Sequence, residues 1–187
     1  MIYGVGYMGN ASTCDENGKK LRSWNIWHDI LGRCYLPTHK RYKDYGAKGI
    51  TICEEWKCFE IFKQWYDFNY YELEGEAVDL DKDILSKGTK IYSPQTCIFV
   101  PRKINSLFRS KPKNDGLPKG IYKDYKKYRV KIKINGKSKE LGGYNTLQEA
   151  QKVYLEAKQK LFIDLVEQYK NEIPDYIYNI LINTKIK

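Results

Sequence analysis

The chain has 187 residues, of which 42% are hydrophobic and 14% aromatic. This length suits one or two domains with a buried core, and the aromatic share argues against global disorder. No apolar run approaches the roughly 18 uncharged residues that a membrane span needs, so we expect no membrane partner. Lysine and arginine number 33 against 23 acidic residues, a net charge of +10, which favours nucleic acid or another anionic surface as the partner.

The five cysteines are an odd number, and the first residues do not combine a basic stretch with an apolar one. We therefore expect no secretion signal, reduced thiols and a cytoplasmic location. Only Cys53 and Cys58 lie close together in the sequence. Because no second cysteine or histidine pair has zinc spacing, the sequence does not favour a structural zinc site.

Residues 1–22, with several glycines and an Asn-Gly turn, are expected to form an arm or a small hairpin. From Ser23, apolar residues recur at three- and four-residue spacing and predict a helix. A polar loop over 39–49 and a short strand over 50–53 follow. A second helix is expected over about 54–70, with its aromatic residues in the core.

Residues 80–85 and 92–101 have the pattern of two short strands joined by a polar loop. The segment 102–109 is expected to be a helix that presents Ile104, Leu107 and Phe108 on one side and Asn105 with basic residues on the other. The predicted order is therefore strand, loop, strand, helix. Two prolines and a glycine in residues 112–118 predict a linker after this helix.

Residues 128–134 alternate apolar and basic side chains, which predicts a strand with an apolar face and a cationic face. Asn135-Gly136 suits a two-residue hairpin turn, and flanking strands over 119–123 and 137–144 would complete a three-stranded antiparallel sheet. Thr146 and Glu149 form a capping box that opens a long helix, and the apolar face of this helix would cover the sheet. A short helix is expected after Pro174.

The positive charge is concentrated in residues 101–143, which hold fourteen basic side chains and only three acidic ones, Asp115, Asp124 and Glu140. A β-ribbon with alternating cations fits the DNA major groove. Arg129 is our choice for base contact because only arginine offers a bidentate fork, and Lys131 and Lys133 are expected to meet phosphates or guanine edges. The alternative is a solvent-exposed strand that lysines protect from aggregation.

Residues 120–123, 128–137, 141–146 and 149–154 resemble the ethylene-response-factor (APETALA-type) DNA-binding domain, three strands packed on one helix. The resemblance implies that outward side chains of the sheet read the major groove. The sequence departs from the family in lacking its arginine and tryptophan in the first strand and turn. The expected DNA-binding residues are Tyr122, Lys123, Lys127, Arg129, Lys131 and Lys133, with Arg102, Lys103 and Arg109 from the preceding helix.

Residues 80–108 resemble the HNH, or ββα-metal, nuclease finger, and residues 27–35 and 45–56 resemble the front half of phage-encoded HNH homing-type endonucleases. The resemblance covers about 30–165 and implies a bacterial host cell as the location. The family's Asp-His pair falls on Asp81 and Lys82, its middle Asn on Thr96 and its last position on Asn105. An ordinary lysine is charged at pH 7 and accepts no proton, although it can bind phosphate.

Asp81, Asp83 and Asn105 offer the oxygen ligands that Mg²⁺ prefers. The competing interpretation is that the two aspartates pair with Lys82, Lys87 or Arg102 and hold the finger together. The two histidines, His28 and His39, are expected to be structural or solvent-exposed rather than catalytic.

The sequence therefore predicts an α+β protein that binds double-stranded DNA and has a degenerate nuclease site. The catalytic candidates are Asp81, Lys82 and Asn105. The alternatives are an active Mg²⁺-dependent endonuclease that nicks DNA and a phage protein-interaction or inhibitor factor. The predicted parts are an arm (1–22), an HNH endonuclease-like domain (23–111) with a helical front and a ββα finger, a linker (112–118), an APETALA-type domain (119–170) and a tail helix (171–187).

Overall fold

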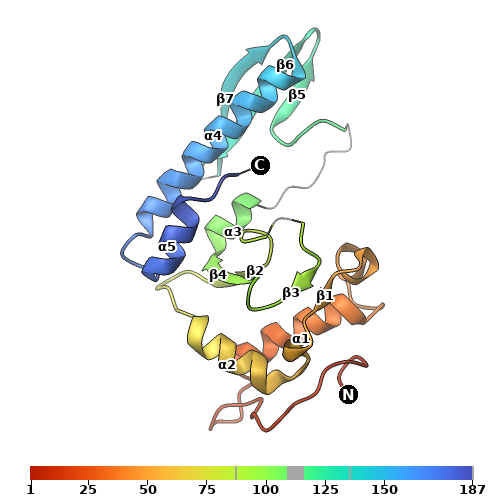
Figure 1. Cartoon of the computed structure of the whole chain (residues 1–187). Helices are drawn as coiled ribbons and strands as arrows, with labels where there is room; N and C mark the ends of the chain where they lie inside the picture. The colour runs from red at the N-terminus through yellow and green to blue at the C-terminus, as the bar shows by residue number, and fades with distance from the viewer. Residues whose placement is uncertain (87, 109–115, 135, 187) are drawn as a thin grey trace. The chain divides into compact units, whose positions relative to one another are not determined.

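The computed structural model describes residues 1–86, 88–108, 116–134 and 136–186. Lys87, Arg109, most of the predicted linker and Asn135 of the predicted hairpin turn lie outside these ranges. The chain forms two compact units, Met1–Val100 and Pro101–Lys187, and each is described by itself below. The chain contains both helices and strands, which confirms the predicted α+β class (Figure 1). No helix among the described residues is long and apolar enough to cross a membrane.

The first unit is built mainly from two helices, α1 (Arg22–Tyr35) and α2 (Phe59–Asn69). Its strands are short and form two pairs. One pair is parallel and joins β1 (Thr51–Ile52) to β3 (Ile91–Tyr92). The other joins β2 (Val78–Asp81) to β4 (Ile98–Pro101). Three 3₁₀ turns lie at Tyr42–Asp44, Gly46–Lys48 and Glu55–Lys57.

Aromatic side chains fill the core of the first unit, as predicted. Trp27, Trp56, Phe59, Phe62 and Phe99 are completely or almost completely buried. The indole N–H of Trp27 donates a hydrogen bond to the backbone carbonyl of Trp56 at 2.6 Å, which satisfies the one polar group of that ring. Trp56 and Phe62 meet edge to face, with ring centroids 5.0 Å apart. The core thus joins the two helices through interlocking rings.

Two predicted strands in this unit are shorter than expected. The strand predicted over 80–85 ends at Asp81, because the Asp81 carboxylate accepts the backbone N–H groups of Asp83 and Ile84 and draws the chain into a turn. The strand predicted over 92–101 is interrupted at 93–97, where the hydroxyl of Thr96 accepts the N–H of Ser93. The second predicted helix begins at Phe59 rather than at residue 54, after the 3₁₀ turn.

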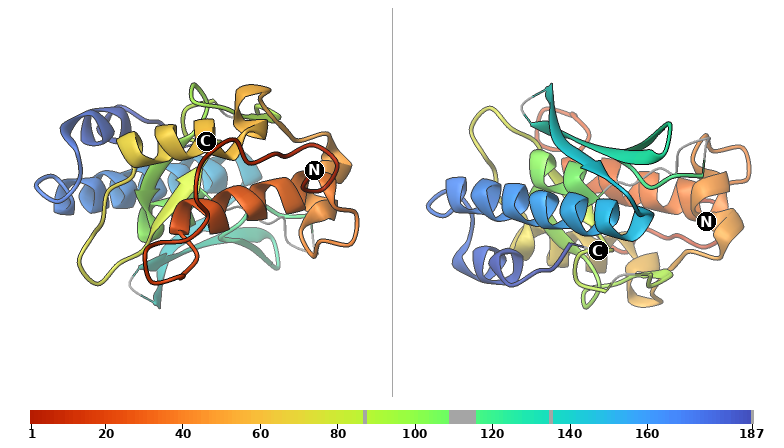
Figure 2. Two further views of the ribbon diagram at one scale, coloured as in Figure 1. Left: turned by 90° about the horizontal axis from the view of Figure 1, so that it is seen from below. Right: turned by 90° about the horizontal axis from the view of Figure 1, so that it is seen from above.

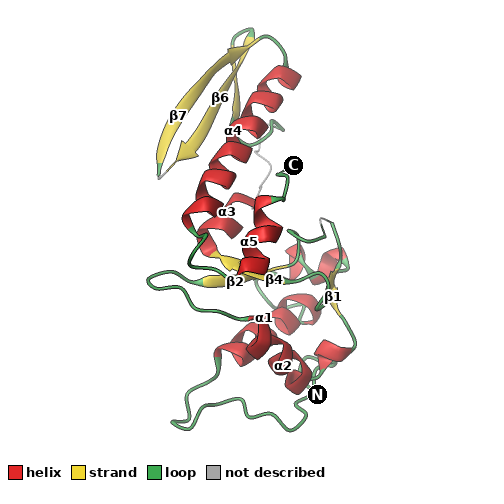
Figure 3. Cartoon of the chain, turned by 60° about the vertical axis from the view of Figure 1, so that its left-hand side comes forward, coloured by secondary structure: helices red, strands yellow, loops and turns green. Residues whose placement is uncertain are grey.

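The second unit contains α3 (Arg102–Phe108), a three-stranded antiparallel sheet and two further helices. The strands are β5 (Ile121–Asp124), β6 (Lys127–Ile134) and β7 (Lys137–Tyr144), in that order across the sheet. The helices are α4 (Leu147–Gln168) and α5 (Asp175–Ile182). The predicted sheet, long helix and short tail helix are confirmed (Figure 3).

The sheet packs against the N-terminal half of α4 (Figures 1 and 2). Ile121, Val130 and Ala150 are fully buried at this contact. Gly120, with φ of +82°, lies under the ring of Tyr154, where an added Cβ atom would overlap a ring carbon. The capping box is confirmed, since the Thr146 side chain accepts the N–H of Glu149 and the Glu149 carboxylate accepts the N–H of Thr146.

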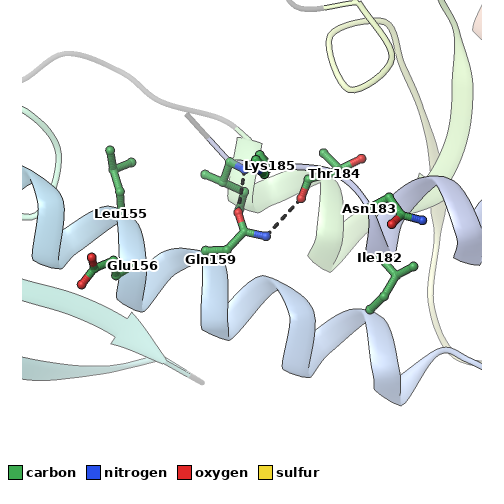
Figure 4. A pocket seen from close by; sticks show the side chains of 8 residues that line it. Leu155, Glu156, Gln159, Ile182, Asn183, Thr184 and Lys185 are labelled. Carbon is green, nitrogen blue, oxygen red and sulfur yellow. Dashed lines mark hydrogen bonds between the residues drawn. The ribbon is translucent and has the colours of Figure 1, made fainter.

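The side chain of Gln159 in α4 bonds to the C-terminal segment. The amide of Gln159 donates to the carbonyl of Thr184 at 3.0 Å and accepts the N–H of Ile186 at 2.7 Å (Figure 4). A side-chain amide carries one acceptor and one donor group, as a backbone peptide does, so Gln159 stands in for a neighbouring strand. These two bonds hold the segment after α5 beside α4.

Candidate nucleic-acid interface

The alternation predicted for β6 is confirmed. Val130 and Ile132 are buried, whereas Arg129, Lys131 and Lys133 are exposed. Because successive side chains of a strand point to opposite faces, the three cations share the face that does not contact α4. This face is called the outer face below. It also carries Lys127, two residues before Arg129.

The register of the sheet determines which residues join these cations. Tyr122 of β5 lies directly opposite Arg129, and Asp124 lies opposite Lys127. On the other side, Gly143, Glu140 and Ser138 of β7 lie opposite the three cations in turn. Directly paired residues share a face of the sheet. The outer face therefore consists of the four cations named above, with Tyr122, Asp124, Ser138, Glu140 and Gly143.

A β-bulge in β7 places Glu140 on the outer face. Val130 pairs with Gly142, but Lys131 pairs with Glu140, so Leu141 is an extra residue. Leu141 packs with the core of the sheet. Gly142 has φ of +121°, a conformation that strongly favours glycine. The Tyr144 hydroxyl donates to the Leu141 carbonyl at 2.9 Å. The bulge thus keeps Leu141 inside and brings Glu140 to the outer face.

Two carboxylates hold the guanidinium of Arg129. Its Nε donates to Asp124 at 2.9 Å, and its Nη1 donates to Glu140 at 2.8 Å. The hydrogen bonds with Asp124 and then Glu140 raise the pKa of Arg129 further above its ordinary value. We name Asp124 and Glu140 the carboxylate pair. Our sequence reasoning counted both acids but gave them no role, because the contact of Glu140 depends on the bulge.

The other predicted DNA-binding residues lie on both faces of the sheet and on α3. The Lys131 ammonium lies 5.9 Å from the centroid of the Tyr122 ring, on the outer face. Lys123 lies opposite Tyr128, which places it on the other face of the sheet although it is exposed. Arg102 and Lys103 are exposed on α3. Arg109 lies outside the described residues.

The predicted nuclease residues of the first unit are engaged in local contacts. Asp81 Oδ1 accepts two backbone N–H groups, from Asp83 at 2.7 Å and Ile84 at 2.8 Å. Burial raises the pKa of the Asp81 carboxyl above its ordinary value. One oxygen of Asp81 therefore shapes a turn.

Lys82, one of the catalytic candidates named from the sequence, is 6% exposed. Its ammonium donates to Asp83 at 2.6 Å and to the Thr89 carbonyl at 3.0 Å. The ion pair between Asp83 and Lys82 is one that the competing interpretation of the aspartates expected. Asn105, the third predicted metal ligand, is buried in the second unit.

No protein-family model matches the chain, and searches of curated proteins and of solved structures give no significant match. Among the described residues, no three His, Cys, Asp or Glu side chains are grouped as a metal site. The Mg²⁺ ligands named from the sequence stay a prediction.

The two histidines have partners in the first unit. His28 Nε2 lies 2.9 Å from the Tyr3 hydroxyl, and the His28 ring lies over Trp24 with centroids 5.4 Å apart. Burial lowers the pKa of His28 below its ordinary value. His39 Nε2 lies 3.4 Å from an oxygen of Asp29. Both histidines thus have contacts of the structural kind that the sequence favoured.

Proposed function

We propose that this protein binds double-stranded DNA through the outer face of the β5–β6–β7 sheet. The observation that carries the proposal is the exposure of Arg129, Lys131 and Lys133 in a row on β6 while their apolar neighbours are buried. A two-stranded ribbon or narrow sheet enters the major groove, where such side chains reach bases and phosphates together. The likeness of residues 120–154 to APETALA-type domains supports the same docking mode.

The charge of the two units agrees with this assignment. Residues 1–100 contain thirteen basic and fourteen acidic side chains, whereas residues 101–187 contain twenty basic and nine acidic ones. A cation that neutralises a phosphate releases a condensed counterion, and this release drives DNA binding at low salt. The excess charge therefore lies in the unit that carries the outer face.

The experiment measures fluorescence anisotropy of a labelled random-sequence duplex at two or more salt concentrations. If six to eight cations meet phosphates, the log–log slope of affinity against salt is about −5 to −7. Lys131→Glu with Lys133→Glu should weaken binding by about 100-fold and flatten the slope by about 2, because two phosphate contacts become repulsive.

The matched control is Lys152→Glu with Lys160→Glu, two exposed lysines of α4. This variant changes the net charge equally but leaves the outer face intact. Equal losses in the two variants would show that binding follows net charge alone and would contradict the proposal. Absence of duplex binding by the unchanged protein would also contradict it.

DNA cleavage is the second candidate, since β2 pairs with β4 and α3 begins directly after β4. Asp81 and Asp83 carry the oxygen ligands that Mg²⁺ prefers, although one oxygen of Asp83 is taken by Lys82. Plasmid incubated with Mg²⁺ or Mn²⁺ tests this candidate. Nicking that Asp81→Ala and Asp81→Asn both abolish would support it, because asparagine retains an oxygen for the turn but loses the charge.

A further inference from the structure

Arg129 differs from the other cations of the outer face in having acidic partners. Asp124 and Glu140 both bind its guanidinium. Within the described part of the chain, Lys127, Lys131 and Lys133 have no carboxylate within ion-pair distance. Glu140 lies directly opposite Lys131 in the register, yet it bonds Arg129 on the diagonal. One cation is therefore treated differently from its neighbours.

The two contacts leave part of the guanidinium available. Arginine has five N–H donors in a planar fork. Asp124 takes the donor on Nε and Glu140 takes one on Nη1, so three remain in the described structure. Gly143, directly opposite Arg129, has no side chain to cover it. The group is thus fixed at two corners and open at its end.

The carboxylate pair also changes what this cation attracts. Arg129 and its two carboxylates together carry a charge of −1, so this guanidinium attracts a DNA phosphate less than an uncompensated arginine would, although Lys127 and Lys131 lie opposite the same two acids. The lysines of β6 carry no such compensation and remain suited to phosphate. A guanine edge in the major groove offers O6 and N7 as neutral acceptors, which arginine binds as a bidentate pair.

We propose that Asp124 and Glu140 are specificity-determining positioning residues, which hold the Arg129 fork for a guanine edge and keep it away from the phosphate backbone. The inference rests on the proposed DNA binding of this same face. It separates two roles on one strand, in which Arg129 distinguishes bases while Lys131 and Lys133 supply affinity that is insensitive to sequence.

The test compares two labelled alternating G·C duplexes by anisotropy, one with ordinary guanine and one with 7-deazaguanine, which lacks the N7 acceptor. Both duplexes carry the same phosphates. The unchanged protein should prefer ordinary guanine by about fivefold or more. Asp124→Ala with Glu140→Ala should bind both duplexes more tightly, with a salt slope steeper by about 1 and a preference close to onefold.

Three further variants separate positioning from charge. Glu156→Ala with Asp164→Ala removes two exposed acids of α4 and should keep the preference. Arg129→Lys keeps the charge but lacks the fork, so it should lose the preference while the carboxylates remain. Glu140→Gln, a smaller change at one half-exposed site, should lower the preference without any loss of helical circular dichroism.

The outcomes distinguish the inference from the proposed function. Duplex binding without preference for ordinary guanine would overturn the inference and leave DNA binding in place. A preference that survives removal of the carboxylate pair would also overturn the inference. Failure of the unchanged protein to bind either duplex would overturn both.

Discussion

The two units place their cations against different kinds of aromatic ring. In the first unit, cations lie on rings that belong to the fold. The Arg33 guanidinium is 4.8 Å from the centroid of Tyr45 and 5.0 Å from that of Tyr92, and Arg22 lies 5.3 Å from that of Tyr70. In the second unit, the lysines of β6 are exposed, and the one ring near them, 5.9 Å from the Lys131 ammonium in the described structure, is that of the exposed Tyr122. The same residue types thus contact rings packed on the core in the first unit and lie on an exposed face of the sheet in the second.

The cores differ in the same sense. The first unit buries large aromatic side chains, whereas the contact between sheet and α4 in the second buries Ile121, Val130 and Ala150. All four tryptophans lie in the first unit. A sheet with one face exposed buries less apolar surface and is stabilised less by it. The second unit thus buries less of its sheet and leaves one cationic face of it exposed.

The largest expected effect is on the core of the first unit. Trp27→Ala should lower the free energy of unfolding by about 3–5 kcal/mol, because it removes a fully buried ring and leaves a cavity. Urea unfolding followed by tryptophan fluorescence reports this unit alone. Phe68→Ala is the control, since its ring is 89% exposed on α2, and it should change stability by less than about 0.5 kcal/mol. Similar losses would contradict the aromatic-core account.

The next effect tests the tight contact of the second unit. Gly120→Ala should cost about 1–3 kcal/mol, because a Cβ at this positive φ meets the Tyr154 ring. Amide hydrogen exchange in β5 and β6 should become faster. Gly116→Ala is matched in backbone conformation, with φ of +71° and no atom within 4 Å of the added Cβ. An equal effect of the two substitutions would assign the cost to the backbone alone.

A smaller effect is expected at the start of α4. Thr146→Ala should destabilise the second unit by about 1 kcal/mol, because the N–H of Glu149 loses its acceptor. Thr146→Ser retains the hydroxyl and should behave as the unchanged protein does. Thermal unfolding by circular dichroism measures both. If the alanine variant unfolds at the same temperature as the unchanged protein, the capping box is not needed to hold α4 against the sheet.

The smallest effect concerns pH and the first unit. The pKa of His28 is lowered from 6.5 by burial. Below this ordinary value the unfolded chain binds more protons at His28 than the folded chain, so the stability that neutral His28 contributes is lost as the pH falls. The free energy of unfolding, measured by tryptophan fluorescence, should therefore fall from pH 7.5 to 5.5. It should fall less in His28→Gln. An identical pH dependence in the two proteins would remove His28 from the account.

Local patterns predicted much of the second unit. The alternation of β6 and the Thr146 to Glu149 capping box are both sequence-local, and both are confirmed. In the first unit, the predicted strand after residue 80 failed at Asp81, where a side chain competes with strand pairing for backbone N–H groups. Hydrophobic periodicity carries no information about hydrogen bonds between a side chain and the backbone.

The candidate site was predicted in part for a related reason. The exposure of Arg129, Lys131 and Lys133 follows from a period of two. The position of Glu140 beside Arg129 does not follow from this period, because the bulge at Leu141 shifts the register of β7 by one residue. Burial of Lys82 with Asp83 and the Thr89 carbonyl likewise depends on how a polar loop folds back.

The bulge also couples the burial of Leu141 to the presence of an acid, Glu140, on the outer face. With regular pairing beyond Val130, Leu141 would lie opposite Lys131 on the outer face, Glu140 would face α4, and Lys139 would lie opposite Lys133. The inward preference of Leu141 therefore determines whether Glu140 lies on the outer face. Exchanging Leu141 for a polar residue should favour the regular register and so remove Glu140 from the outer face without altering any charged side chain.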